Sequence, residues 1–188
     1  DRYPYTACQT SIASLFPDAF MEGGAKHALE RLRSLAQRQR LRRALLQRHR
    51  RRDRWDTILL CFAEGNAREF EGLTLRQAAE RLALDPPDAI MEILQRSRLN
   101  ASGIFFDMSE EDLKKILQWP FVFVGSDSSA RALRGPTAQG KPHPRTFGSF
   151  ARYLSEYVLK QKLLPLAEGI ARITSLPARR FGLRDRGE

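Results

Sequence analysis

Short apolar runs alternate along this chain with longer stretches in which apolar residues recur every three or four positions. The runs at 57–62, 103–108 and 121–124 predict strands, and the first of them reads as buried. Residues 1–8, aromatic and β-branched with a proline at position 4, predict the end of a strand and its exit loop. Gly and Pro within 15–24 predict a loop.

Helical periodicity fills most of the remaining sequence. It predicts helices at 26 to about 52, 74 to about 82, 85 onward, 109 to about 119, 147–158, 165–174 and within 175–182. Three starts carry capping signals, at Thr74, Asp85 and Ser109. The side chains expected to be buried in the last two long helices are Phe147, Phe150, Leu154, Tyr157, Val158, Leu166, Ile170 and Ile173.

Alternation of strands with helices favours an α/β fold with a parallel sheet or barrel. A complete eight-stranded barrel takes about 250 residues. The chain has 188 residues, so it is too short to hold one. No repeat of fixed period indicates another architecture.

The composition is typical of a folded protein, and its positive charge makes nucleic acid a possible class of partner to consider. Hydrophobic residues make up 42% of the chain, and the net charge of +10 raises nucleic acid as a ligand. Much of the excess charge lies between Arg31 and Arg54, where Trp55 is the one nearby aromatic residue for base stacking. A solvated helix face explains this charge better than phosphate binding, so we do not expect nucleic acid as a partner.

The apolar runs, the first residues and the cysteines indicate where in the cell the protein is expected. No apolar run approaches the roughly 18 residues needed to span a bilayer, and we expect no membrane contact. Asp1 to Pro4 lack the pattern of a signal peptide and start without Met, as a fragment would. Cys8 and Cys61 form no close motif, so a reducing, cytoplasmic setting is expected.

The stretch 121–149 carries the candidate chemistry. Its apolar run ends at Asp127, and a loop rich in Gly and Pro brings His143 and Arg145 to the start of a helix. Asp127 reads equally as a catalytic carboxylate and as the cap of the following turn. Arg145 offers a planar fork for a carboxylate, or is a surface cation. His143, between two prolines, is either a supporting donor or a loop residue.

Five motifs occur in one order along the chain, and together they resemble a known family. They are Tyr3–Ala7, Met108–Asp112, Gly125–Asp127, Gly140–Arg145 and Thr174–Ala178. The series is similar to the C-terminal half of the N-acyl-D-amino-acid deacylases, or D-aminoacylases, of the amidohydrolase superfamily. The resemblance covers nearly the whole chain and is weakest from about 25 to 100, where the family carries an inserted segment.

The resemblance implies a zinc-dependent (β/α)8 TIM-type barrel that hydrolyses the amide bond of N-acyl-D-amino acids. This chain would supply the last strands and helices of that barrel, with an inserted, mostly helical segment. Residues 1–24 would hold barrel strand 6 and its exit loop, and 25–56 a basic helical segment. Residues 57–108 would hold the strand 7 region and a helical insertion, and 109–188 strand 8, the catalytic loop and the C-terminal helices.

The resemblance also assigns roles. Asp127 matches the catalytic aspartate, which takes a proton from the attacking metal-bound water and later passes it to the leaving amine. Arg145 matches the arginine that holds the substrate carboxylate, Tyr3 lines the same site and Met108 lies in the acyl pocket. His143 is a further substrate-binding candidate. Cys8-Gln9 stands where the family has a small or hydroxyl residue, which leaves the substrate preference open.

The expected zinc has no ligands in this chain. The family's metal ligands are a cysteine and several histidines on earlier strands, and neither His27, His49 nor His143 matches one. We therefore expect zinc in the complete enzyme, the missing N-terminal half as a partner, a small N-acyl amino acid as substrate and no activity in the isolated chain. The alternative is a catalytically inactive remnant or a basic binding module.

Overall fold

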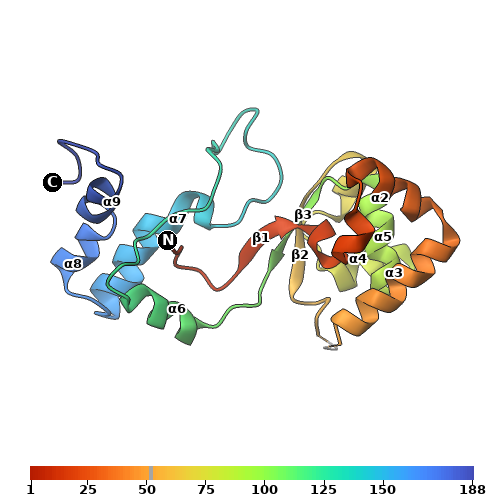
Figure 1. Ribbon diagram of the computed structural model, residues 1–188, viewed down its shortest axis with the longest axis horizontal. Coiled ribbons are helices and arrows are strands. Elements are labelled where there is room, and N and C mark those ends of the chain that lie inside the picture. Colours follow the sequence, from red (N-terminus) through yellow and green to blue (C-terminus); the bar gives the residue numbers. More distant parts are fainter. Residues whose placement is uncertain (51–52) are drawn as a thin grey trace. The chain divides into compact units, whose positions relative to one another are not determined.

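The computed structural model describes residues 1–50 and 53–188, which form two compact units (Figure 1). The terminal unit consists of Asp1–Ala7, Asp107–Ala138 and His143–Glu188. The central unit consists of Cys8–Phe106 and Gln139–Pro142. In the described part of the chain, no helix has the length and apolar character that crossing a membrane requires.

The sheet of the central unit is antiparallel. Its three strands, β1 (Cys8–Ser11), β2 (Ile58–Ala63) and β3 (Ala101–Phe105), lie in the order β1-β3-β2. Both pairs are antiparallel, so the predicted parallel pairing is wrong for these strands. A pair of helices joins β2 to β3, and the second helix brings the chain back so that β3 runs against β2.

The N-terminal part of the central unit differs from the prediction in three places. The strand begins at Cys8, within the expected exit loop, and residues 1–7 form no strand. The predicted loop at 15–24 contains helical turns at η1 (Ile12–Leu15) and α1 (Asp18–Met21). The predicted helix from 26 is two helices, α2 (Gly24–Arg33) and α3 (Leu35–Arg48), because Ser34 takes an extended conformation with ψ 120°. Its predicted end at Arg51 and Arg52 lies outside the described residues.

The capped helices of the central unit form as predicted. After the turn η2 (Gly65–Phe70), the helix α4 (Leu75–Leu82) starts with a reciprocal capping box, in which Thr74 and Gln77 accept from each other's backbone N–H. The Asp85 carboxylate caps α5 (Pro86–Arg96) by accepting from the Asp88 N–H. Both caps satisfy N–H groups that have no partner inside the helix.

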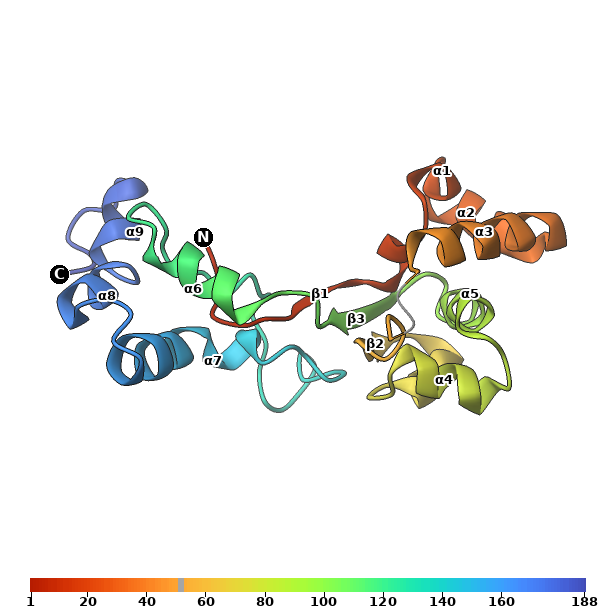
Figure 2. The same cartoon turned by 90° about the horizontal axis from the view of Figure 1, so that it is seen from below.

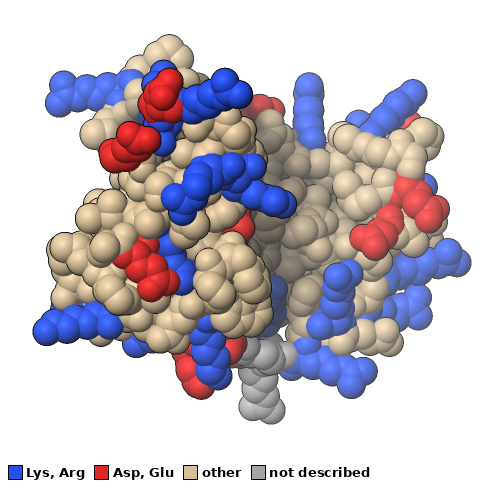
Figure 3. Space-filling view, turned by 60° about the vertical axis from the view of Figure 1, so that its left-hand side comes forward, with Lys and Arg blue, Asp and Glu red and all other residues tan. Residues whose placement is uncertain are grey.

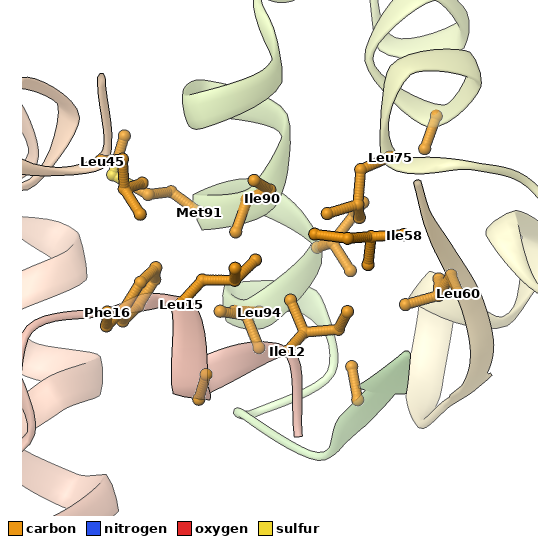
Figure 4. Close-up of a cluster of buried hydrophobic side chains, with 14 of the residues drawn as sticks. Ile12, Leu15, Phe16, Leu45, Ile58, Leu60, Leu75, Ile90, Met91 and Leu94 are labelled. Atoms are coloured by element: carbon orange, nitrogen blue, oxygen red, sulfur yellow. The ribbon is translucent and has the colours of Figure 1, made fainter. Parts of the chain in front are cut away.

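The hydrophobic core of the central unit joins these helices to the sheet. Figure 4 shows its side chains pointing toward one another from the strands and helices of this unit. The labelled core residues are Ile12, Leu15, Phe16, Leu45, Ile58, Leu60, Leu75, Ile90, Met91 and Leu94. Arg38 and Arg42 of α3 bond outside this core to α5 and its cap, through Gln95, Asp85 and Asp88. Part of the basic helix therefore has a structural role.

The terminal unit is built from helices and extended segments, seen again in Figure 2. Its helices are α6 (Glu110–Gln118), α7 (Arg145–Arg152), the π-helix η3 (Tyr153–Lys160), α8 (Leu166–Ala171) and α9 (Ser175–Arg180). The Ser109 hydroxyl caps α6 by accepting from the Asp112 N–H, as predicted.

The predicted strand at Phe121–Val124 is extended but is not a strand of a sheet. Val122 and Val124 are buried, while Phe121 is exposed. One backbone bond reaches this segment from the chain start, where the Arg2 N–H donates to the Phe123 carbonyl at 3.0 Å. A single bond does not make a ladder. Residues 121–124 are therefore extended and partly buried, as in a strand, but they do not pair with the strands of the sheet.

The helical faces of the terminal unit are partly mispredicted. Leu113, Leu117, Val124, Tyr153, Tyr157 and Val158 form its core. Phe147 and Phe150 are 52% and 47% exposed, and Leu166 and Ile170 are also exposed. Phe147 and Phe150 precede a π-helix, whose hydrogen bonds span five residues rather than four, so their face of α7 is out of line with the buried Tyr157 and Val158.

Candidate functional site

Asp127 lies where the extended segment turns into the loop. Its φ of +47° is left-handed, a conformation that Asp and Asn adopt more readily than other non-glycine residues. Its Oδ2 lies 2.8 Å from Arg145 Nη1, and its side chain is 66% exposed. The predicted base and the predicted carboxylate clamp therefore form an ion pair, with the carboxylate facing water.

Arg145, the first residue of α7, is a buried cation. It is 8% exposed, which rules out the reading as a surface charge. Its guanidinium carbon lies 4.6 Å from the centre of the Tyr3 ring, within cation–π range. Its Nη1 makes no hydrogen bond of acceptable angle to any described residue, despite the short distance to Asp127.

Arg2 is a second cation against the same ring. Its guanidinium carbon lies 4.7 Å from the Tyr3 ring centre. Its Nη2 donates to the Tyr5 carbonyl at 2.9 Å and to Met108 Sδ at 3.0 Å. Through Arg2, the structure brings the predicted residues Tyr3 and Met108 together. Sequence reasoning missed Arg2, whose one signal was its place beside Tyr3.

His143 supports the start of α7. It is buried, and its Nδ1 accepts the backbone N–H of Arg145 at 3.0 Å. Its ring packs edge-on against Tyr5, with ring centres 5.2 Å apart, and at a tilt against Tyr3. Burial lowers the pKa of His143, the Arg145 charge lowers it further, and a backbone hydrogen bond with Ala7 opposes both. The imidazole thus holds Arg145 in place as a neutral acceptor.

Comparison with curated proteins finds relatives of one kind. The chain is 36% identical to the N-acyl-D-glutamate deacylase of Alcaligenes xylosoxydans xylosoxydans over 137 residues, which are 73% of this chain and 25% of that protein. It is 32% identical to a D-aminoacylase of the same organism over 120 residues, 64% of this chain and 22% of the relative. No family model matches the chain.

Solved structures agree. The N-acyl-D-glutamate deacylase from Bordetella bronchiseptica, complexed with zinc and a phosphonate mimic of the tetrahedral intermediate, matches 98% of this chain with a TM-score of 0.65 and 28% identity. A D-aminoacylase that defines a novel subset of amidohydrolases matches all of this chain with a TM-score of 0.63 and 25% identity. The chain covers 29% of each of these two structures.

This chain is related to the N-acyl-D-amino-acid deacylases. The resemblance expected from its five motifs is confirmed. The chain spans about a quarter of the length of the curated deacylases that it matches. It shares a mixed α/β fold with the deacylase structures, although its own sheet has three strands.

The residues of this deacylase relative supply no set of metal ligands in the described ranges, 1–50 and 53–188. No group of three or more His, Cys, Asp or Glu side chains there is placed to hold a metal ion. His27 Nδ1 bonds to the Gly23 carbonyl, and the His49 ring packs against Trp55. His143 is engaged with Arg145. The zinc named for the Bordetella deacylase thus finds no donor set among these residues.

The loop that follows Asp127 makes hydrogen bonds near its start and near its end. Near its start, the Ser128 hydroxyl donates to the Thr146 hydroxyl at 2.9 Å. Further along, the Lys141 N–H donates to the Cys61 carbonyl at 2.7 Å, and its ammonium to the Glu71 carbonyl at 3.3 Å. Lys141 therefore bonds within the central unit, whereas Arg145 lies beside Asp127.

We predict that His143 makes the terminal unit less stable in acid. The unfolded histidine protonates near its ordinary pKa of 6.5, whereas the buried imidazole stays neutral to a lower pH. The unfolded state thus binds more protons as pH falls below about 6.5, so unfolding becomes easier by at most about 1.4 kcal/mol per pH unit. Urea unfolding of a Trp55→Phe variant, followed by Trp119 fluorescence at pH 7.5 and 5.5, measures this change.

The variant His143→Gln should remove this part of the pH dependence, because the amide keeps an acceptor and does not titrate. His27→Gln, in the central unit, is the matched control and should leave it intact. An unchanged pH dependence in His143→Gln would show that other groups cause it.

Proposed function

We propose that this chain is part of a zinc-dependent amidohydrolase that hydrolyses the amide bond of N-acyl-D-amino acids. One observation carries the proposal: Tyr3, Asp127 and Arg145, from three separate motifs, converge in the terminal unit. The similarity to deacylases in sequence and structure supports it. The cytoplasmic setting stays part of the proposal.

Asp127 acts as general base and then general acid. The Asp127 side chain is 66% exposed, and once the substrate carboxylate takes its place on Arg145 its oxygens are free to accept a proton. As a water oxygen adds to the amide carbon, Asp127 takes the water proton. When the C–N bond breaks, Asp127 returns that proton to the nitrogen, and a carboxylate and a free D-amino acid leave.

Arg145 binds the carboxylate of the substrate. Its guanidinium is fixed by the Tyr3 ring and by the His143 bond at the start of α7, so it is oriented before the ligand arrives. Because Asp127 faces water, its ion pair with Arg145 is weak. A substrate carboxylate can therefore replace Asp127 on Arg145 at a small cost in free energy. Tyr3 would line the site, Met108 the acyl pocket, and His143 would act through Arg145.

We place the metal ligands and the rest of the barrel outside this chain. The described residues do not fit a zinc site, so no catalytic step is assigned to zinc here. The terminal unit would form the end of a (β/α)8 barrel, with residues 121–126 as its eighth strand. The buried Val122 and Val124 and the backbone bond from Arg2 support this assignment. The N-terminal remainder of the protein would be its partner.

The test of the proposed function is hydrolysis by the full-length protein that carries this chain. It should release glutamate from N-acetyl-D-glutamate, spare N-acetyl-L-glutamate and lose activity when a chelator removes the metal. Absence of hydrolysis across a panel of N-acyl-D-amino acids, or equal rates for both enantiomers, would contradict the proposal.

The ion pairs of the basic helix favour the enzyme over a basic binding module. On the face drawn in Figure 3, Lys and Arg side chains project singly or in small groups, with Asp and Glu among them. Arg42 pairs with Asp85 and Asp88. Salt-sensitive binding to DNA in the absence of hydrolysis would support the module instead.

A further inference from the structure

Two guanidinium groups share one aromatic ring in the terminal unit. The carbons of Arg2 and Arg145 lie 4.7 Å and 4.6 Å from the centre of the Tyr3 ring, so the sum of these distances limits their separation. Like charges repel at such range, and their proximity favours an anion between or beside them. The proposed function uses one of these cations and leaves Arg2 unexplained.

The two arginines differ in whether a carboxylate neutralises their charge. Arg145 has Asp127 at 2.8 Å. Within residues 1–50 and 53–188, no carboxylate forms an ion pair with Arg2, and its buried Nε has no hydrogen-bond acceptor. A buried N–H without an acceptor is costly, and a ligand carboxylate would remove that cost.

Arg2 is also held in a fixed orientation. Its Nη2 bonds to the Tyr5 carbonyl and to Met108 Sδ, while Tyr3 packs on the guanidinium. The bond to Met108 places Arg2 beside a residue expected to line the acyl pocket. These contacts use only Nη2 and the face of the group, so Nη1 and Nε have no acceptor among the described residues.

We propose that Arg2 binds a second carboxylate, and that the substrates are N-acyl derivatives of acidic D-amino acids. This inference rests on the proposed function. Arg145 holds the α-carboxylate and Arg2 the side-chain carboxylate, so the site takes a dianion. A substrate with a neutral side chain leaves Arg2 Nε without a partner and is bound less tightly.

The test compares N-acetyl-D-glutamate with N-acetyl-D-glutamine, which has nearly the same shape and one negative charge fewer. In the full-length protein, kcat/KM should be about 10- to 100-fold higher for the glutamate compound, the range of a hydrogen bond to a charged group. Arg2→Met should abolish this preference by lowering kcat/KM for the glutamate compound alone. Arg180→Met, at an exposed arginine of the same unit, is the matched control and should retain the preference.

Two results would overturn the role of Arg2. One is equal kcat/KM for both compounds in the unmodified protein. The other is an equal loss for both in Arg2→Met, which would indicate a structural role. If neither compound is hydrolysed, the proposed function fails, and calorimetric binding still decides this inference. Tighter binding of the glutamate compound, lost in Arg2→Met, supports it, and equal binding of the two compounds refutes it.

Discussion

Replacing Asp127 by Asn should lower kcat for deacylation about 100- to 10,000-fold, the range for loss of a general base. The amide has nearly the shape of the carboxylate but cannot take up the proton of water at neutral pH. Asn also tolerates the left-handed φ of +47°, so the backbone should be unchanged. Steady-state release of the D-amino acid by the full-length protein measures the loss.

The chain offers a matched control for this substitution. Asp185 has a left-handed φ of +53° and is exposed in the C-terminal segment, outside the site. Asp185→Asn therefore makes the same chemical and backbone change without removing the base, and its kcat should stay within about twofold of the unmodified protein. Activity retained in Asp127→Asn, or lost equally in both variants, would refute the catalytic role of Asp127.

Replacing Arg172 by Met should destabilise the terminal unit by about 3–5 kcal/mol, as expected when one partner of a buried charged network is removed. Arg172 Nη1 donates to the carbonyls of Leu117, Trp119 and Val122 at 2.7, 2.6 and 3.2 Å. Its Nη2 pairs with Glu168 at 2.6 Å. The Trp119 carbonyl also accepts from the Val122 N–H, but the Leu117 carbonyl, in the last turn of α6, has no partner inside the helix. Arg172→Met would leave that carbonyl buried and unsatisfied.

Urea unfolding resolves this effect because each unit carries one of the two tryptophans, Trp55 and Trp119. In a Trp55→Phe background, Trp119 fluorescence reports on the terminal unit alone. Arg179→Met, at an exposed position, should change the free energy of unfolding by less than about 0.5 kcal/mol. Arg172→Lys should fall between the two, because an ammonium cannot reach all of these carbonyls. Arg172→Met and Arg179→Met of equal stability would show that the network is unimportant.

Local features of the fold were predictable because their signals lie within a few residues. Thr74, Asp85 and Ser109 each cap the helix that the sequence indicated. The pairing of the strands depends on how two intervening helices return the chain, which spacing alone does not express. The exposed face of α7 depends on the π-helix after it, and no residue type signals that turn.

Some residues of the candidate site were likewise predictable from the sequence, and others were not. Its motifs identified Tyr3, Asp127 and Arg145, which the structure brings together although their roles stay proposals. Arg2 of the site and the structural Arg172 were missed, because an arginine in a basic chain carries no sign of the contacts that it makes. What distinguishes them is contact with distant segments, Met108 for Arg2 and the end of α6 for Arg172.

The division of the active site between this chain and the rest of the protein is tested most directly by zinc content and hydrolysis measured together. For the 188 residues alone we predict no stoichiometric zinc and no release of D-amino acid. For the full-length protein we predict bound zinc and hydrolysis, and for its Asp127→Asn variant bound zinc without hydrolysis. Zinc-dependent hydrolysis by the 188 residues alone, or loss of zinc in Asp127→Asn, would contradict this division.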